Sequence, residues 1–299
     1  MPQLTRRVFL YDCGRMLCAL LLPVRDARAP ARQARELRVL ALVDSDTGAA
    51  RPSLRRGIEL GADEAKHTMS LFGTSLALTV QTVANAAAAE RDAVRGKGGP
   101  SAVIRAIGDG CLTKWLTPAV PTIDVACAAY ETPETDANPI GGEPTSLTAG
   151  AKSGILLHTQ PSRRTIRHVG SSEMAATLPP APNGRRRVEV WHESLARFGG
   201  EQLNQRYRRR FDAPMDSDAW AAWIAVKIVA ESSLRAHATT PDELAHALSD
   251  ARMQFDGQKG RPLIFDPRTG ELIQPLYIVD SGADSGRSTV IAEVLPEDR

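Results

Sequence analysis

The chain has 299 residues, 42% of them hydrophobic, and its 37 basic and 35 acidic side chains give a net charge of +2. This near-neutral charge excludes nucleic-acid binding driven by bulk charge. The length is enough for two modest lobes, each with its own hydrophobic core. The arginine runs at 185–187 and 208–210 are interpreted as solvated loop and helix faces.

The first 29 residues predict an export signal. The sequence TRRVFL at residues 5–10 resembles the twin-arginine signal of bacteria, and an Ala-Arg-Ala cleavage pattern ends at residue 29. The apolar stretch between them, residues 16–24, is too short to span a bilayer, which needs about 20 residues. Removing the segment takes away five Arg and two Asp, so the net charge becomes −1. We therefore predict a soluble periplasmic protein that begins near Pro30.

The first half of the mature chain alternates strands with helices. Residues 37–44 are typical of a buried strand, and Ser53 is the expected N-cap of an amphipathic helix that ends at Gly73. Further strands are predicted at 76–83, 101–107 and 120–127, with helices at 85–95 and 112–117. Such alternation with short connections predicts an α/β fold with a parallel sheet and right-handed crossovers.

The second half reads as a loop-rich segment followed by helices and a hairpin. Residues 131–152 and 178–187 are irregular, with a short strand at 154–158 between them. Helices are predicted at 195–211, 216–237 and 241–251. The last has a capping box of Thr240 and Glu243, and the middle one is apolar on most sides and should be buried. The segments 262–265 and 271–279 flank a turn and predict a hairpin.

The loop after the first predicted strand, Asp-Ser-Asp-Thr-Gly at 44–48, has two enzymatic interpretations. Asp44 and Asp46 resemble the paired aspartates of haloacid-dehalogenase-type phosphatases, with Asp280 and Asp284 as a Mg²⁺-holding pair. That family places its Thr two residues beyond the second Asp, whereas Thr47 follows Asp46 directly. Residues 46–48 also spell the aspartic-protease triplet, but a second triplet is absent. The phosphatase stays as an alternative.

The remaining motifs do not form a catalytic constellation. Gly108-Asp109-Gly110 lacks the third Gly of a nucleotide fingerprint and predicts a strand-to-helix turn, whose free backbone N–H groups favour an anion such as a carboxylate. The six histidines show no spacing suited to zinc, and no G-x-S-x-G motif occurs. We therefore predict that the protein is not an enzyme and needs no metal or cofactor.

Two blocks of the C-terminal third carry a family resemblance. Residues 197–236 and 255–280 resemble the type I periplasmic binding proteins of the leucine/isoleucine/valine class. Residues 155–164 and the Trp-Ala-Ala-Trp at 220–223 resemble a narrower branch, the substrate-binding proteins that accompany pyrroloquinoline-quinone-dependent alcohol dehydrogenases.

The resemblance implies a two-lobed receptor that passes a small polar solute to an ABC permease in the inner membrane. Residues 30–150 would form the first lobe, and residues 151–299 a second lobe with a hinge-crossing helix and the C-terminal hairpin. The ligand would lie at the carboxyl ends of the parallel strands. The expected ligand-binding residues are Ser45, Asp46, Thr47, Gly108, Asp109, Gly110, Cys111, Ala126, Cys127 and Ala128.

The chain departs from the family pattern in two ways. The Ser/Thr hydroxyls that usually hold an amino-acid carboxylate are replaced at 108–111 and 126–128 by Gly, Cys and Ala. In the family's usual strand order the third and fourth strands are neighbours, which would place Cys111 opposite Cys127 and suggests a disulfide between them. In addition, a strand–helix succession of the second lobe is missing at Arg167, so this lobe is expected to be reduced.

Two hypotheses for the function therefore remain in addition to the phosphatase. The first is a monomeric solute-binding protein for an amino-acid-like or alcohol-metabolism-related solute, with the 45–47 loop holding the ligand. The second is an interaction module for a quinoprotein dehydrogenase or a cytochrome that has lost solute binding. An alternative role for Asp44 and Asp46 is to cap backbone amides of their own loop.

Overall fold

The computed structural model describes residues 35–44, 52–83, 98–107, 120–127, 154–158, 185–267, 270, 272–281 and 288–295. The predicted export signal and the predicted helices at 85–95 and 112–117 lie outside the described residues.

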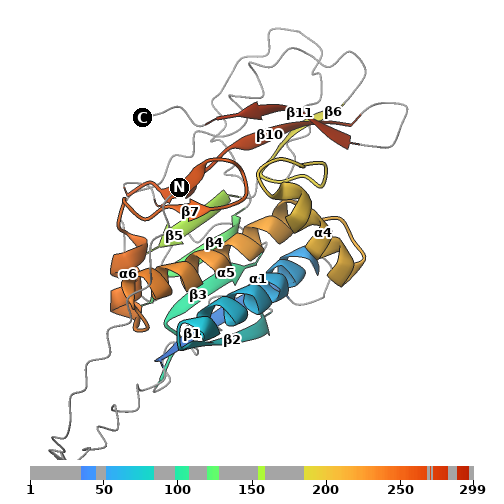
Figure 1. Ribbon diagram of the computed structural model, residues 1–299. Helices are drawn as coiled ribbons and strands as arrows, with labels where there is room; N and C mark the ends of the chain where they lie inside the picture. The colour runs from blue at the N-terminus through green and yellow to red at the C-terminus, as the bar shows by residue number, and fades with distance from the viewer. Residues whose placement is uncertain are drawn as a thin grey trace, which may run out of the picture. The chain divides into compact units, whose positions relative to one another are not determined.

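A five-stranded sheet in the order β2-β1-β3-β4-β5 forms the main layer (Figure 1). Its strands are β1 (Arg35–Asp44), β2 (Thr74–Val83), β3 (Ala102–Ala106), β4 (Thr122–Cys127) and β5 (Gly154–His158). The first four are parallel, with β1 lying between β2 and β3, which confirms the predicted parallel sheet. The short β5 pairs with β4 in the antiparallel direction.

Two long helices, α1 (Pro52–Leu71) and α5 (Ser217–Ala236), lie side by side against this sheet (Figure 1). Alternate residues of a strand face opposite sides of a sheet. In β1, Leu37, Val39 and Ala41 join the large core with both helices, whereas Leu40 and Leu42 belong to a separate cluster on the opposite face.

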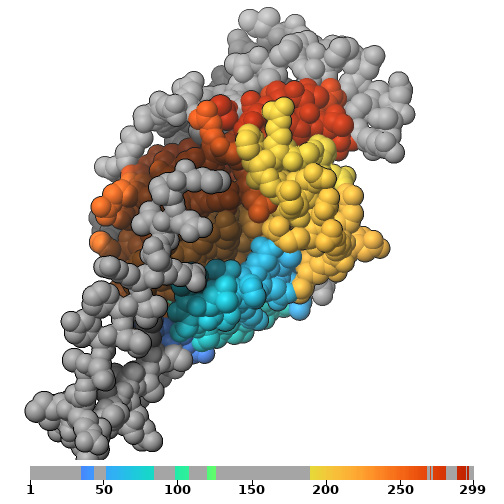
Figure 2. All heavy atoms as spheres, in the orientation of Figure 1, coloured from blue at the N-terminus to red at the C-terminus, as the bar shows by residue number. Residues whose placement is uncertain are grey.

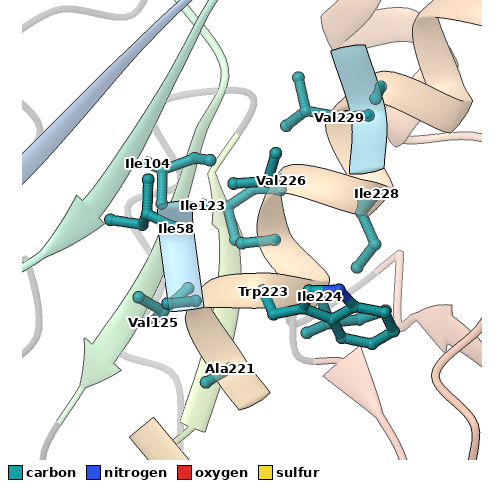
Figure 3. Close-up of a cluster of buried hydrophobic side chains, with 14 of the residues drawn as sticks. Ile58, Ile104, Ile123, Val125, Ala221, Trp223, Ile224, Val226, Ile228 and Val229 are labelled. Atoms are coloured by element: carbon teal, nitrogen blue, oxygen red, sulfur yellow. The ribbon is translucent and has the colours of Figure 1, made fainter. Parts of the chain in front are cut away.

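The sequence of α5 explains why it is buried along most of its length. Asp216 caps its N-terminus by accepting a hydrogen bond from the Ala219 amide at 2.8 Å, and alanines and β-branched residues fill its interior. Figure 3 shows Val226 of α5 on the side of the helix toward Ile104 of β3 and Ile123 of β4, and Ile224 of α5 belongs to the same hydrophobic cluster. The predicted buried helix is therefore confirmed.

The close approach of α1 to α5 depends on two glycines of α1. A Cβ on Gly57 would lie 2.1 Å from the Ala219 carbonyl oxygen, and a Cβ on Gly61 would lie 2.9 Å from that of Trp223. Only hydrogen fits in this space, because real Cβ atoms do not approach a backbone oxygen so closely. The contacts also show that the helices run in the same direction, since later residues of α1 meet later residues of α5.

Polar contacts attach a third helix, α4 (Gly200–Phe211), to α1. Glu64 of α1 accepts a hydrogen bond from Arg206 of α4 at 2.7 Å and one from the Trp223 indole of α5 at 2.9 Å. The space-filling view shows α4 directly beside α1 (Figure 2). This helix begins at Gly200 rather than at the predicted residue 195, because Phe198 and Gly199 take positive φ angles of 54° and 90° that no helix accepts.

The C-terminal predictions are confirmed in type but need correction in extent. Helix α6 (Pro241–Leu248) has the predicted capping box, with both reciprocal hydrogen bonds between Thr240 and Glu243. The hairpin forms from β8 (Pro262–Phe265) and β9 (Leu272–Ile273), with β7 (Phe255–Asp256) on the other side of β8. The predicted strand 271–279 is in fact two strands, and its second part belongs to another sheet.

That other sheet is antiparallel, in the order β11-β10-β6, and two of its strands were not predicted. It consists of β6 (Arg185–Glu189), β10 (Leu276–Ser281) and β11 (Ser288–Val294). The prediction of an irregular stretch through residue 187 was wrong over the three arginines. Arg186 pairs with Asp280 across the ladder, a partner 94 positions away that local pattern cannot reveal.

Part of the predicted second lobe joins the main sheet and its helices. Both β5 and α5 come after residue 150, the predicted end of the first lobe, yet β5 pairs with β4 and α5 packs on β3 and β4. The division at residue 150 and the hinge crossing of α5 stay predictions.

We predict that Gly57→Ala destabilises the fold by about 2–3 kcal/mol, because the new methyl group must displace the Ala219 carbonyl or push α5 off the sheet. Chemical denaturation measures this change. Lys66→Ala, on the exposed side of the same helix, should change stability by less than about 0.5 kcal/mol. Equal effects of the two substitutions would contradict the close packing.

Candidate functional site

The carboxyl ends of three neighbouring strands meet at one edge of the main sheet. Strands β1, β3 and β4 are adjacent and parallel, with Val39 opposite Ala102 and Val103 opposite Thr122. Each of the segments predicted to bind a ligand begins at or just after one of these ends. The topology therefore brings together the ends from which the three predicted binding segments leave, and we refer to this as the strand-end edge.

Only part of the predicted site falls within the described residues. Asp44 is the last residue of β1, and Ala126 and Cys127 are the last two of β4. Eight predicted residues lie outside the described part: Ser45, Asp46, Thr47, Gly108, Asp109, Gly110, Cys111 and Ala128. The ligand contacts and the disulfide between Cys111 and Cys127 therefore stay predictions.

The N-terminus of α5 lies toward the same edge and carries its own carboxylate. Helix α1 follows β1, and α5 runs in the same direction as α1, so both helices begin near the strand-end edge. Burial raises the pKa of Asp216, and hydrogen bonds from the Ala219 amide and the Ser53 side chain oppose this rise. Because the Asp216 side chain accepts from the Ala219 amide, that amide at the N-terminus of α5 is not free to bind a ligand anion.

The buried side chain of Tyr207 is affected by the charge of Asp216. Burial and the negative charge of Asp216 raise the pKa of Tyr207 to about 12, although the nearby Arg56 acts in the opposite direction. The phenol therefore keeps its proton throughout the physiological range.

A buried ion pair, which the sequence analysis missed, lies between β3 and β4. Arg105 Nη1 and Asp124 Oδ2 are 2.9 Å apart, with side chains 3% and 0% exposed. The available signal was an arginine inside an otherwise apolar strand, followed by an aspartate inside the next one. Charged groups are rarely buried so completely unless they are paired, so the two together would have indicated a cross-strand pair.

A second buried charge-bearing group, Lys259, was also missed. Its Nζ donates to Gln274 Oε1 at 2.7 Å and to the Pro275 carbonyl at 2.9 Å, and it lies 3.9 Å from the centre of the Trp220 ring. Burial lowers the pKa of Lys259 well below its usual value, while the charge of Glu293 acts in the opposite direction.

Lys259 is part of an aromatic junction, formed with Trp191, Trp220 and Tyr277, between the α5 layer and the antiparallel sheet. The Trp191 and Trp220 rings are stacked with their centres 5.8 Å apart and their planes 7° apart. Trp191 follows β6, Trp220 is on α5 and Tyr277 is on β10. The centre of the Tyr277 ring is 5.2 Å from Lys259 Nζ. The junction therefore joins α5 to the antiparallel sheet through side chains.

The described residues give no support to the phosphatase. Asp280 lies in the antiparallel β10, in a different sheet from Asp44, and Asp284 is outside the described part. Within the described residues, no three His, Cys, Asp or Glu side chains are grouped as metal ligands would be. Among the helices that the structure describes, none has the length and apolarity to cross a membrane.

Comparison with solved structures identifies the fold. No protein-family model and no curated protein matches the sequence. A possible leucine/isoleucine/valine-binding protein from Rhodopirellula baltica SH 1 is 13% identical, with a TM-score of 0.52, and 87% of this chain aligns with 97% of that one. An ABC transporter substrate-binding protein from Desulfitobacterium hafniense, in complex with Leu, is 14% identical, with a TM-score of 0.53 and coverages of 86% and 100%. The chain has the type I periplasmic-binding-protein fold.

A third structure agrees with this assignment. The amino acid ABC transporter substrate-binding protein from Pseudomonas fluorescens Pf-5 is 11% identical, with a TM-score of 0.53, and 88% of this chain aligns with 97% of it. At such low sequence identities, the similarity between this chain and the three structures shows a shared fold and nothing further. The predicted association with a quinoprotein dehydrogenase system stays a prediction.

We predict that the stability of the protein rises with pH in the range below 10.5, the usual lysine pKa, because of Lys259. Since the folded-state pKa is lowered, the unfolded chain binds a proton that the folded chain lacks between the two values. The cost of burial is full below the lowered pKa and disappears as pH approaches 10.5. Lys259→Met should remove this rise, as measured by denaturation at several alkaline pH values.

Lys227→Met provides the matched control. Lys227 also lies over a tryptophan ring, that of Trp223 at 5.8 Å, but its side chain is 25% exposed and paired with Glu231. It should leave the pH dependence as in the parent. An alkaline rise that persists in Lys259→Met would show that another group causes it.

Proposed function

We propose that this protein is a periplasmic solute-binding protein that presents a small polar solute to an ABC permease without chemically changing it. The observation that carries the proposal is the convergence of the β1, β3 and β4 carboxyl ends at one edge of a sheet with the type I periplasmic-binding fold. Open α/β sheets generally bind ligands in the crevice at the carboxyl ends of their strands. Export and periplasmic location are part of the same proposal.

The described functions of the similar structures support a solute-binding role. Two of the three are named substrate-binding proteins of ABC transporters, and one of these holds leucine. The third is named as a possible leucine/isoleucine/valine-binding protein. A solute of comparable size, with at least one charged or strongly polar group, therefore comes first for testing.

The strand-end residues favour a ligand held mainly by backbone amides. Residues 108–111 and 126–128 offer no Ser or Thr hydroxyl, but their amides can donate to a carboxylate. Hydroxyl groups come instead from Ser45 and Thr47, after β1, and carboxylates come from Asp46, after β1, and Asp109, after β3. We infer that the anionic end of the solute lies toward the amides that follow β4, and that its neutral or cationic polar end lies toward these two carboxylates.

We predict that at least one solute class raises the melting temperature of the mature protein. A thermal-shift panel of L-amino acids, amides, short alcohols and carboxylic acids at about 1 mM, with L-leucine first, is the measurement. Ligand that binds only the folded state must stabilise it. If no solute of the panel raises the melting temperature, and the protein co-purifies with a dehydrogenase or a cytochrome, an interaction module is the better description than a solute-binding protein.

We further predict that Thr47→Val weakens binding of the active solute up to about ten-fold, the effect of one lost hydrogen bond. Titration calorimetry measures the dissociation constant. The same substitution at Thr289, on the exposed strand β11, should not affect binding. If both variants bind like the parent, the β1 loop is not a ligand contact.

A further inference from the structure

We propose that Arg105 and Asp124 form a positioning pair that sets the geometry of the strand-end edge. This inference rests on the proposed function, since it assigns to the pair a role in shaping the site where the solute would bind. Neither residue is among those expected to contact the ligand.

The pair joins the two strands from which two of the predicted binding loops leave. Arg105 and Asp124 are direct cross-strand neighbours in the β3–β4 ladder, and their charged groups are 2.9 Å apart. Their flanking residues Ile104 and Ile123 belong to the core that faces α1 and α5. By the alternation of side chains along a strand, the pair lies on the opposite face, beside Leu42 of β1 in the same row.

Arg105 and Asp124 are the last pair of residues in the β3–β4 ladder. Arg105 Nη1 also donates to the carbonyl of Ile107 at 3.4 Å, and Ile107 is the last residue before the predicted loop at 108–111. On the other strand, the β4–β5 pairing is irregular between Asp124 and Cys127, the segment that contains Ala126. Such irregularities are common next to binding sites, because they redirect the chain.

The energetics favour a positioning role over a purely stabilising one. Moving both charges out of water is costly, and well-packed apolar residues of similar volume often stabilise a fold as much or more. An apolar pair, however, makes no directional hydrogen bonds. A planar guanidinium has fixed donor directions, so it can bond to Asp124 and to the Ile107 carbonyl only when both strand ends hold one relative arrangement.

We expect that removing the pair changes the geometry of the strand ends without a large change in the stability of the fold. Replacing both residues by apolar ones removes the two members of the pair together, so neither Arg105 nor Asp124 is left as a buried charge without the other, and the chain should still fold. The ends of β3 and β4 should then open more often, because nothing selects a single arrangement of them. A solute that needs both loops in place would bind more weakly.

Hydrogen–deuterium exchange of the double variant Arg105→Met/Asp124→Leu tests this without any ligand. Exchange in peptides covering 103–107 and 122–127 should be at least about ten-fold faster than in the parent, which corresponds to more frequent local opening. Peptides from α1 and α5 should not change, and the melting temperature should stay within about 5 °C. Unchanged exchange at the strand ends in a folded double variant would overturn the proposal.

A matched control and a conservative variant complete the experiment. Arg208→Met/Glu193→Leu removes an ion pair of 2.6 Å that is largely exposed, and it should not affect the strand ends. Arg105→Lys keeps one charge next to Asp124 but cannot also reach the Ile107 carbonyl, so faster exchange should be confined to peptide 103–107. If the double variant fails to fold, parent-like exchange in Arg105→Lys overturns the proposal.

Titration of L-leucine into parent and double variant separates this inference from the proposed function. If the parent binds L-leucine, the double variant should bind it at least about ten-fold more weakly, and equal affinity would overturn the positioning role. If the parent binds neither L-leucine nor any other solute of the panel, the proposed function fails. The exchange result still decides whether the pair orders the strand ends.

Discussion

The close contact between α1 and α5 is the constraint on which the rest of the architecture depends. At Gly57 and Gly61 the two backbones approach to a distance that excludes any side chain. This lets α5 lie over β3 and β4 while α1 covers the neighbouring part of the sheet. A helix held further away would leave part of the apolar surface of the sheet in contact with water, at a cost of about 25 cal/mol per Å².

Two buried charged groups lie where elements must keep a defined relation, and the protein compensates them differently. Arg105 meets an opposite charge, Asp124, on the next strand, and also reaches the Ile107 carbonyl at the strand-end edge. Lys259 Nζ donates to neutral oxygens and lies against aromatic faces, and burial lowers its pKa despite the opposing charge of Glu293. The first group acts beneath the proposed ligand site, and the second joins α5 to the antiparallel sheet. Both depend on surroundings that exclude water.

The sequence predicted what local patterns determine and missed what distant partners determine. The limits of α5 and the capping box at Thr240 follow from residues within a few positions, and the structure confirms them. Strands β6 and β11 were missed because the first is arginine-rich and the second is mostly exposed. Each is a strand because it pairs with β10. For the site, the parallel sheet was predictable, and an arginine and an aspartate inside two consecutive apolar strands were the available signal for the cross-strand ion pair.

The central claim is that the carboxyl ends of β1, β3 and β4 hold a solute. The most direct measurement is the amide NMR spectrum of the ¹⁵N-labelled protein during titration with the solute that stabilises it most. The account predicts that the largest shifts fall on the ends of these strands and on the loops that follow them, at residues 45–47, 108–111 and 126–128. Shifts confined to β10, β11 and the aromatic junction, with Ile107 and Ala126 unchanged, would contradict it.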